Sequence, residues 1–503
     1  MRYLNHIRPV RTALCVALAG AAIFASQASA AISNRYSFND GTANDSVSGQ
    51  NGIVYGTNAS FSGGELNLAN NPSPGSNSNN DGTGAGGWVD LPNGLVSAAA
   101  AGGASGQVSI EMWVTMNSNG NWRALFSAGR SNGGEGISDS AGGQPYVQII
   151  PRTGDGGRGN DFRVTTSSSA GEGPTTWVDD LGDGNGTDLQ IGRKEHVLAV
   201  LDQSGGLPGS LTVYRNGALM GTSGISGALD LVNFAADEVN VWLGRSQWND
   251  GMVDARFDEL RIYNTAVTPQ QALANAVFGP NVTNAAAIPS IEVDKTTGAI
   301  TLKNNSAAPL NLEYYAISST AGAMNVGGWN SLDQQNYNAV DGPDDGSVAG
   351  DSPGEGWDAA GGSNANLLNE LFLGSAGSLL APNATLSLGN AYNTSVFGGA
   401  DGDLQFEFGV NGGALFEGTV SYVTSGGTPG NFNNDTKVDG ADFLVWQRGF
   451  GAPYGPADLT AWRNNYGAGV PATAAAGAIP EPASASLALG LLAAAWLGVR
   501  KRV

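Results

Sequence analysis

The sequence predicts a mainly β chain with two sandwich units, a short helical module and a C-terminal transmembrane helix. Hydrophobic residues recur at every second position in many short segments, which is the pattern of half-buried strands. Glycine makes up 76 of the 503 residues and charged residues make up 13%, a turn-rich composition that favours short strands over helices. At roughly 100 to 200 residues per domain, this length allows about three folded units.

Residues 1–30 have the features of a secretory signal peptide. Met1–Arg11 is basic, Thr12–Phe24 is apolar, and Ala28-Ser29-Ala30 is a small-x-small cleavage site. An N-terminal membrane anchor is the alternative, although the apolar run is short for a helix that must cross about 30 Å of hydrocarbon. We therefore expect the chain to be exported, either to the cell envelope and outer surface or as a secreted protein.

Residues 479–503 predict a transmembrane helix whose C-terminus stays in the cytoplasm. Ala483–Val499 is mostly apolar, and the basic cluster Arg500-Lys501-Arg502 follows at once. Pro480-Glu481-Pro482 stands just before the apolar run. In this order the three elements resemble the PEP-CTERM sorting tail of Gram-negative and planctomycete-like bacteria, and the resemblance implies cleavage by an exosortase. An ordinary membrane tail anchor is the alternative.

Charge and composition exclude several classes of function. The chain has 23 Lys and Arg against 44 Asp and Glu; without the six basic residues at its two ends, 17 remain and the net charge is −27. Phosphate backbones repel such a chain, so we expect no nucleic-acid binding. Beyond the signal peptide there is no Cys and one His, His196, which excludes disulfide frameworks, Cys/His zinc sites and cysteine nucleophiles.

Residues 31–280 predict an antiparallel sandwich that ends in a short helix. One long strand is indicated by alternating apolar residues, namely Val108, Ile110, Met112, Val114 and Met116. Further strands are expected at 196–201, 211–215, 239–243 and 258–262. Asn216-Gly217 signals a hairpin turn. Thr268-Pro269-Gln270-Gln271 supplies an N-cap, a proline at the first helical position and a capping-box glutamine, so a helix should follow before Gly279-Pro280.

Four segments of this unit carry a family resemblance. They are Arg35–Asp40, Val108–Met116, Trp242–Arg245 and Phe257–Asn264, the last followed by the helix signal. Together they resemble the LamG-like, concanavalin A-like jelly roll over about 250 residues, half of the chain. The resemblance implies a two-sheet sandwich. Residues 288–423 repeat the period-two pattern and predict a second, smaller β-sandwich, for which no family resemblance is apparent.

Residues 431–467 predict a calcium module of two short helices. Oxygen-bearing groups fall at EF-hand loop positions 1, 3, 5, 7, 9 and 12, and the candidate ligands are Asn431, Asn433, Asp435, the backbone carbonyl of Lys437, Asp439 and Asp442. Ala441–Gly451 recurs as Ala457–Gly467 with a period of 16 residues.

This tandem arrangement resembles a type I dockerin, which implies calcium as cofactor and a cohesin-like protein as partner. Three departures weaken the calcium loops: Asn431 replaces the usual Asp, Thr436 stands where Gly eases the turn, and the second loop has shrunk. At most one calcium site is expected. The alternative is a metal-free helical hairpin with Trp446 and Trp462 packed together.

The function expected of the jelly roll is non-catalytic, adhesive binding of a polysaccharide or of extracellular matrix at the cell surface. Folds of this kind stack aromatic rings against sugars on loops and a concave face. Four tryptophans lie in Gly-, Asn- and Asp-rich stretches between predicted strands and are the candidate ligand-binding residues: Trp88, Trp122, Trp177 and Trp248. Tryptophans in such positions are more often core or rim residues than ligand platforms, which is the alternative for each of the four. A purely structural spacer role is an alternative for the whole protein.

A glycoside hydrolase is the catalytic alternative, because related jelly rolls carry two-carboxylate catalysis. The expected Glu-x-Asp-x-x-Glu strand signature is absent, and Glu111 stands alone in its strand. The adjacent residues Asp258 and Glu259 should point to opposite faces, with Asp258 directed inward beside Leu260. His196 begins an apolar strand with no Gly-x-Ser-x-Gly elbow nearby, so we expect it to be structural. The prediction is therefore no enzymatic activity.

Overall fold

The computed structural model describes residues 30–69, 86–103, 106–154, 161–167, 177–179, 188–227, 229–285, 287–338, 356–359, 362–374, 377–410, 414–424, 430–433, 435, 437–450 and 454–469. These residues belong to two compact units, divided between Ala287 and Ile288. The predicted signal peptide up to residue 29 and the predicted membrane helix within 479–503 lie outside these ranges. Within them, no helix is long and apolar enough to cross a membrane.

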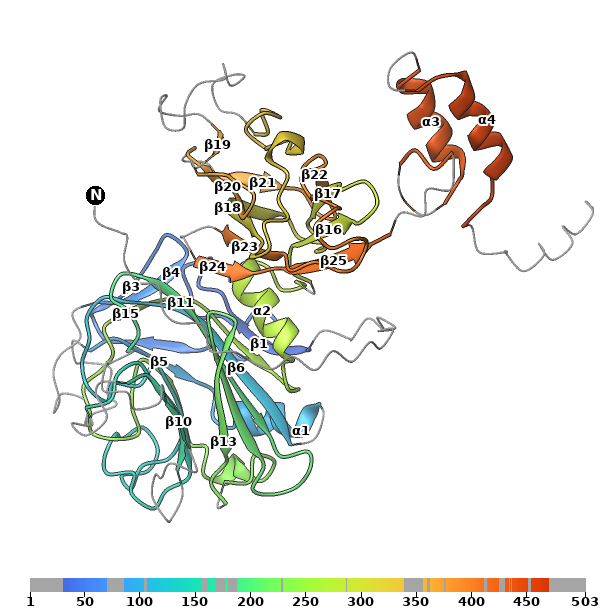
Figure 1. Ribbon diagram of the computed structural model, residues 1–503. Coiled ribbons are helices and arrows are strands. Elements are labelled where there is room, and N and C mark those ends of the chain that lie inside the picture. The colour runs from blue at the N-terminus through green and yellow to red at the C-terminus, as the bar shows by residue number, and fades with distance from the viewer. Residues whose placement is uncertain are drawn as a thin grey trace, which may run out of the picture. The chain divides into compact units, whose positions relative to one another are not determined.

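The first unit is built from two antiparallel sheets (Figure 1). One sheet has the order β13-β12-β11-β6-β15-β4-β3, with β1 also paired to β15. Its strands are β1 (Ile32–Tyr36), β3 (Ala59–Ser62), β4 (Glu65–Leu68), β6 (Gln107–Met116), β11 (Lys194–Asp202), β12 (Ser210–Arg215), β13 (Ala218–Gly224) and β15 (Ala255–Tyr263). The other sheet has the order β10-β9-β8-β7-β14-β5-β2. Its strands are β2 (Ile53–Tyr55), β5 (Trp88–Leu91), β7 (Phe126–Gly129), β8 (Tyr146–Ile150), β9 (Arg163–Ser167), β10 (Trp177–Asp179) and β14 (Asn240–Leu243).

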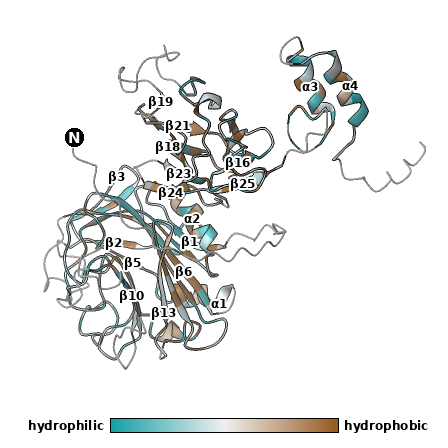
Figure 2. Ribbon diagram, in the orientation of Figure 1, coloured by the Kyte–Doolittle hydropathy of each residue, from teal (hydrophilic) through white to brown (hydrophobic). Residues whose placement is uncertain are grey.

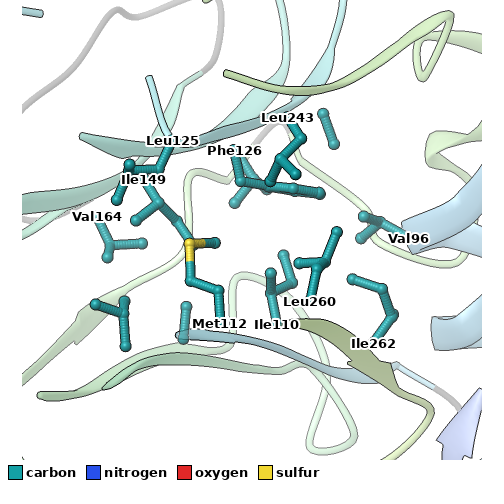
Figure 3. Packing of buried hydrophobic residues seen from close by; sticks show 14 of the residues in the cluster. Val96, Ile110, Met112, Leu125, Phe126, Ile149, Val164, Leu243, Leu260 and Ile262 are labelled. Atoms are coloured by element: carbon teal, nitrogen blue, oxygen red, sulfur yellow. The ribbon is translucent and has the colours of Figure 1, made fainter. Parts of the chain in front are cut away.

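The core lies between these sheets and confirms the predicted period-two pattern. All five alternating apolar residues of β6 are buried and belong to one cluster with residues of the opposite sheet, such as Phe126 and Leu243 (Figure 3). Figure 2 shows hydrophobic residues along the strands of this unit. Because full burial of such a side chain contributes roughly 1.5–3 kcal/mol, the shared cluster holds the two sheets together.

The predicted inward orientation of Asp258 is wrong. The pairing of β15 with β6 shifts register between Phe257 and Glu259, so Asp258 is the extra residue of a β-bulge. Phe257 and Leu260 still enter the core, whereas the Asp258 carboxylate forms an ion pair with Lys194. A one-residue bulge resets the alternation, which the sequence pattern could not reveal.

The helices and the hairpin of this unit agree with their sequence signals. Helix α2 (Pro269–Phe278) has Thr268 as its N-cap, whose side chain accepts a hydrogen bond from the Gln271 backbone N–H. The Gln271 side chain donates to Asn275 instead of closing a capping box. Asn216 and Gly217 have φ values of 51° and 78°, as a type I′ hairpin turn between β12 and β13 requires. The unit also contains α1 (Leu95–Gly102) and the 3₁₀ turn η1 (Phe234–Ala236).

The second unit begins with two further sheets, in agreement with the predicted mainly β fold. The four-stranded sheet, in the order β22-β17-β16-β25, contains β16 (Ser290–Asp294), β17 (Ile300–Lys303), β22 (Thr385–Ser387) and β25 (Thr419–Val423). The six-stranded sheet, in the order β19-β20-β18-β23-β24 with β21 beside β18, contains β18 (Leu310–Ser318), β19 (Trp357–Ala359), β20 (Leu367–Phe372), β21 (Ser378–Leu380), β23 (Gln405–Val410) and β24 (Ala414–Glu417). A 3₁₀ turn, η2, spans Val326–Gly328.

Two helices, α3 (Gly440–Arg448) and α4 (Pro456–Asn465), follow in the region predicted as the calcium module. Phe443 lies between two indole rings, with ring centroids 5.5 Å from Trp446 and 5.0 Å from Trp462. The indole N–H of Trp462 donates to the Asp439 carbonyl at 2.7 Å. These aromatic contacts pack the helical hairpin together at its centre.

Candidate functional site

The outer face of the seven-stranded sheet carries a row of side chains that point away from the core. Inward residues such as Val164 and Val241 belong to the core cluster, so their neighbours along each strand face outward. Cross-strand register aligns one outward residue from each of six strands in the order Trp177, Thr165, Gln148, Ser127, Trp242 and Asp90. This row spans the sheet from β10 to β5.

The middle of the row is covered by a buried polar network. The Gln148 side-chain amide donates to Ser246 Oγ at 2.9 Å, and that of Gln247 donates to Ser127 Oγ at 2.9 Å. All four residues are at most 2% exposed. Because their hydrogen-bonding groups are satisfied inside the protein, these residues have a structural role and do not form a binding surface.

Trp88 belongs to a buried aromatic cluster, so its expected position as an exposed ring between strands is wrong. It lies in β5, is 2% exposed, stacks on Tyr55 at 4.7 Å and contacts Trp242 edge-on at 5.7 Å. The Arg245 guanidinium lies 4.5 Å from the Trp88 ring centroid. Burial lowers the pKa of Arg245 to about 10, and the Asp90 carboxylate opposes this effect. The composition of the flanking loop misled the sequence prediction.

Trp122 and Trp177 are brought together by an arginine that the sequence analysis missed. The Arg163 guanidinium lies 4.0 Å from the Trp177 ring centroid and 5.5 Å from that of Trp122. Arg163 is 1% exposed and forms an ion pair with Asp179 at 3.4 Å, whereas both tryptophans are half-buried. We call these three side chains the Trp122–Arg163–Trp177 stack. The alternation of Arg163 with Val164 in a strand was the one signal that could have located it.

Two local features hold this stack in place and give it a polar neighbour. Trp122 has φ of 63°, a left-handed conformation that is uncommon for a bulky residue, and its backbone N–H donates to the Arg152 carbonyl at 2.9 Å. Thr165 lies directly opposite Trp177 in the β9–β10 pairing. Its hydroxyl oxygen is buried and has no hydrogen-bond partner among the described residues. An aromatic surface therefore stands beside an unused hydroxyl.

Trp248 is held separately from the stack. Its indole N–H donates to the Tyr146 hydroxyl at 3.0 Å, and its ring is half-buried. Its backbone N–H donates to Ser246 Oγ at 3.1 Å, which ties it to the buried polar network. The structure thus pairs two of the four predicted tryptophans, buries the third and attaches the fourth to a packing network.

Glu111 and His196, the residues considered for catalysis, lie in a different and fully enclosed cluster. The Glu111 carboxylate contacts His196 Nε2 at 2.8 Å, the Tyr263 hydroxyl at 2.6 Å and the Asn275 amide of α2 at 2.8 Å. Arg261 adds an ion pair at 3.3 Å. Burial alone raises the pKa of Glu111, but the hydrogen bond and charge of His196 and the charge of Arg261 outweigh it and lower that pKa. Such a saturated, buried carboxylate is a structural group.

Five of the six predicted calcium ligands lie in the loop before α3 and Asp442 lies in its first turn, but their carboxylates do not converge. Among the described residues no group of three or more His, Cys, Asp or Glu side chains is arranged to hold a metal ion. Asp442 is fully buried and accepts hydrogen bonds from the backbone N–H groups of Phe432, Asn433 and Asp439. Asp435 accepts from the Lys437 backbone N–H, and Asp439 from that of Ala441.

One oxygen of this loop remains unused. The side-chain oxygen of Asn431 is buried without a hydrogen-bond partner among the described residues. An all-oxygen donor set suits calcium, as does that orphaned atom. The carboxylates of Asp435, Asp439 and Asp442 already accept hydrogen bonds from backbone N–H groups. To bind a metal ion they must rotate or use their remaining lone pairs.

Comparison with known proteins finds one family model that matches part of the first unit. Residues 82–272 match the profile of the concanavalin A-like lectin/glucanases superfamily, which supports the LamG-like resemblance for this part of the chain. No curated protein sequence matches the chain.

Two solved structures match part of this chain at low sequence identity. Domain 4 of AbnA, a GH43 extracellular arabinanase from Geobacillus stearothermophilus, in complex with arabinotriose, is 21% identical with a TM-score of 0.35; the match covers 50% of this chain and 100% of that one. The CBM40 of the Ruminococcus gnavus IT-sialidase bound to alpha2,3 sialyllactose is 11% identical with a TM-score of 0.28; here the match covers 44% of this chain and 98% of that one.

Proposed function

We propose that the first unit is a non-catalytic carbohydrate-binding module. The Trp122–Arg163–Trp177 stack carries this proposal, because half-buried indole rings held in fixed positions offer flat apolar surfaces for the C–H faces of a sugar. The match to a lectin and glucanase superfamily supports a carbohydrate ligand for this fold.

The carboxylates on this face do not suit glycoside hydrolysis. The described strands place two of them there, Asp90 on β5 and Asp179 on β10, with four strands between them. At about 4.8 Å per strand the separation is about 24 Å. Retaining and inverting hydrolases hold their carboxylates about 5 to 10 Å apart. This distance favours binding over hydrolysis.

A retention assay with product analysis tests the binding proposal. The purified chain, kept in a sugar-free polyoxyethylene detergent, is passed over a panel of soluble and insoluble polysaccharides, and each eluate is assayed for reducing ends. We expect retention on at least one polymer without release of reducing ends. Release of reducing ends would favour the hydrolase alternative, and absence of retention on every polymer would favour the spacer alternative.

The cellular setting proposed for this module rests on the sequence alone. We infer an exported protein, anchored or sorted at the cell envelope through residues 479–503, with an exosortase as processing partner and a cohesin-like protein as partner of the helical module. Protease treatment of intact cells tests the exposure: the jelly roll should be digested while a cytoplasmic marker survives. Protection of the jelly roll in intact cells would contradict it.

Calcium binding by loop 431–442 is proposed on the oxygen-rich spacing and on the buried, unused oxygen of Asn431. Asn431, Asn433, Asp435, the Lys437 carbonyl, Asp439 and Asp442 would hold the ion. It would supply a positive charge that draws the carboxylates of the loop together and so stabilises the start of α3.

A further inference from the structure

The six-stranded sheet of the second unit has one face in its core and one face open to a cavity. Tyr315 and Ile317 of β18 are fully buried, and their neighbours Tyr314, Ala316 and Ser318 line the opposite face. That cavity has a volume of about 470 Å³. Its remaining lining comes from polar and apolar residues of β20, β23, β24 and β25 and of the segments beside them: Leu367, Leu404, Gln405, Phe406, Glu407, Glu417, Gly418 and Val420.

Strand register arranges this face as a grid. Across four strands one row reads Leu371, Tyr314, Gly409 and Leu415, and the next reads Asn369, Ala316, Glu407 and Glu417. The small side chain of Ala316 and the missing one of Gly409 leave a hollow in the middle of the grid. Leu371 and Leu415 are 41% and 56% exposed at either side of it.

Two acidic residues border this hollow in an arrangement that weakens the free protein. Glu407 and Glu417 lie directly opposite each other on neighbouring strands, where like charges are destabilising. Neither carboxylate forms an ion pair or a side-chain hydrogen bond with another described residue. Burial, and then the charge of Glu417, raise the pKa of Glu407. The side-chain oxygen of Asn369 is also buried without a hydrogen-bond partner among the described residues.

From this geometry we propose that the hollow binds the ammonium or guanidinium group of a lysine or arginine side chain on a partner peptide. The two carboxylates and the Asn369 oxygen are all acceptors, so the complementary group is a cation that carries several N–H donors. The Tyr314 ring and the apolar lining accommodate the methylene stem of such a side chain. Leu371 and Leu415 provide contacts for aliphatic residues on either side of it.

A divalent cation fits this site less well than an organic cation. Calcium takes six to eight oxygen ligands gathered around one point, and among the described residues no group of three or more His, Cys, Asp or Glu side chains is arranged to hold a metal ion. Part of the lining is hydrocarbon, including Leu367, Leu404 and Val420, and it contributes nothing to a metal ion. This site lies in a different unit from the proposed sugar site, so the two proposals stand or fall separately.

Fluorescence anisotropy with a defined peptide tests the proposal on the full-length chain in detergent. The probe is carboxyfluorescein-Ala-Leu-Lys-Leu-Ala-amide, labelled on its N-terminal nitrogen so that the lysine amine stays free, and its counterpart carries Gln in place of Lys. We expect the lysine peptide to bind at least tenfold more tightly than its counterpart, with affinity falling as NaCl rises. The double variant Glu407→Gln with Glu417→Gln should lose at least tenfold in affinity for the lysine peptide.

A matched control removes the same charge elsewhere. Glu135→Gln with Asp139→Asn changes two exposed acidic residues of the first unit and should leave the affinity within twofold. Equal binding of both peptides to the wild-type chain would overturn the proposal, and this comparison does not require any variant to fold. Calcium chloride binding that depends on Glu407 and Glu417, without peptide binding, would also overturn it in favour of a metal site.

Discussion

Glu111 offers the sharpest test of the view that the buried charges of the jelly roll are structural. Its carboxylate is fully buried and shared by Arg261, His196, Tyr263 and Asn275. Removing one partner of a buried ion pair costs about 3–5 kcal/mol, because the other charge stays buried and uncompensated. Glu111→Ala should therefore remove a large part of a total stability of about 5–15 kcal/mol. Glu111→Gln keeps the shape and one acceptor and should cost less.

Urea unfolding of the full-length chain measures this effect through the transition of the first unit. With an m-value of about 3 kcal/mol/M, the Glu111→Ala midpoint should fall by roughly 1 to 2 M. Glu135→Gln, at an exposed position, is the control and should change stability by less than about 0.5 kcal/mol. If Glu111→Ala cost less than about 1 kcal/mol, the network would not be stabilising the fold, and a functional role for Glu111 would have to be reconsidered.

Two further predictions concern the second unit. Burial raises the pKa of Glu370 from 4.5 to about 7. At a pH between these two values, Glu370 is protonated in the folded unit and ionised in the unfolded chain. The stability of the folded unit should therefore fall by on the order of 3 kcal/mol as pH rises from about 4.5 to about 7. In unfolding measured at pH 5 and pH 8, Glu370→Gln should flatten this dependence. An unchanged pH dependence in the variant would refute the assignment. Calcium should raise the melting temperature of the helical module in the wild type but not in Asp435→Ala, monitored by circular dichroism with calcium and then with chelator; equal shifts in both chains would count against the loop as the site.

The sequence could predict those features that depend on local pattern. The alternating residues of β6, the Asn216-Gly217 turn and the Thr268 cap each act through backbone geometry within a few residues, and all three are confirmed. Asp258 shows the limit of such reasoning, because a bulge is decided by the pairing of β15 with β6 and leaves no mark in the alternation.

The candidate site was only partly predictable for the same physical reason. Trp122 and Trp177 are 55 positions apart in sequence and meet through Arg163, which lies on β9, between them in the chain. Trp88 stands beside a glycine-rich stretch but belongs to a strand, where register and not composition decides its burial. The burial and the partners of these tryptophans are therefore decided by contacts between distant segments, which composition does not reveal.

The affinity of the stack variants for a polysaccharide tests the central claim most directly. Affinity electrophoresis of the full-length chain through gels containing a polymer that retains it would compare the wild type with Trp122→Ala/Trp177→Ala and with the control Trp248→Ala. Two stacking surfaces at about 0.5–1.5 kcal/mol each sum to about 1–3 kcal/mol, which predicts a loss of roughly five- to 150-fold for the double variant. The Trp248→Ala control should stay within twofold of the wild type. A double variant that binds as tightly as the wild type would contradict the assignment of the sugar site to the Trp122–Arg163–Trp177 stack.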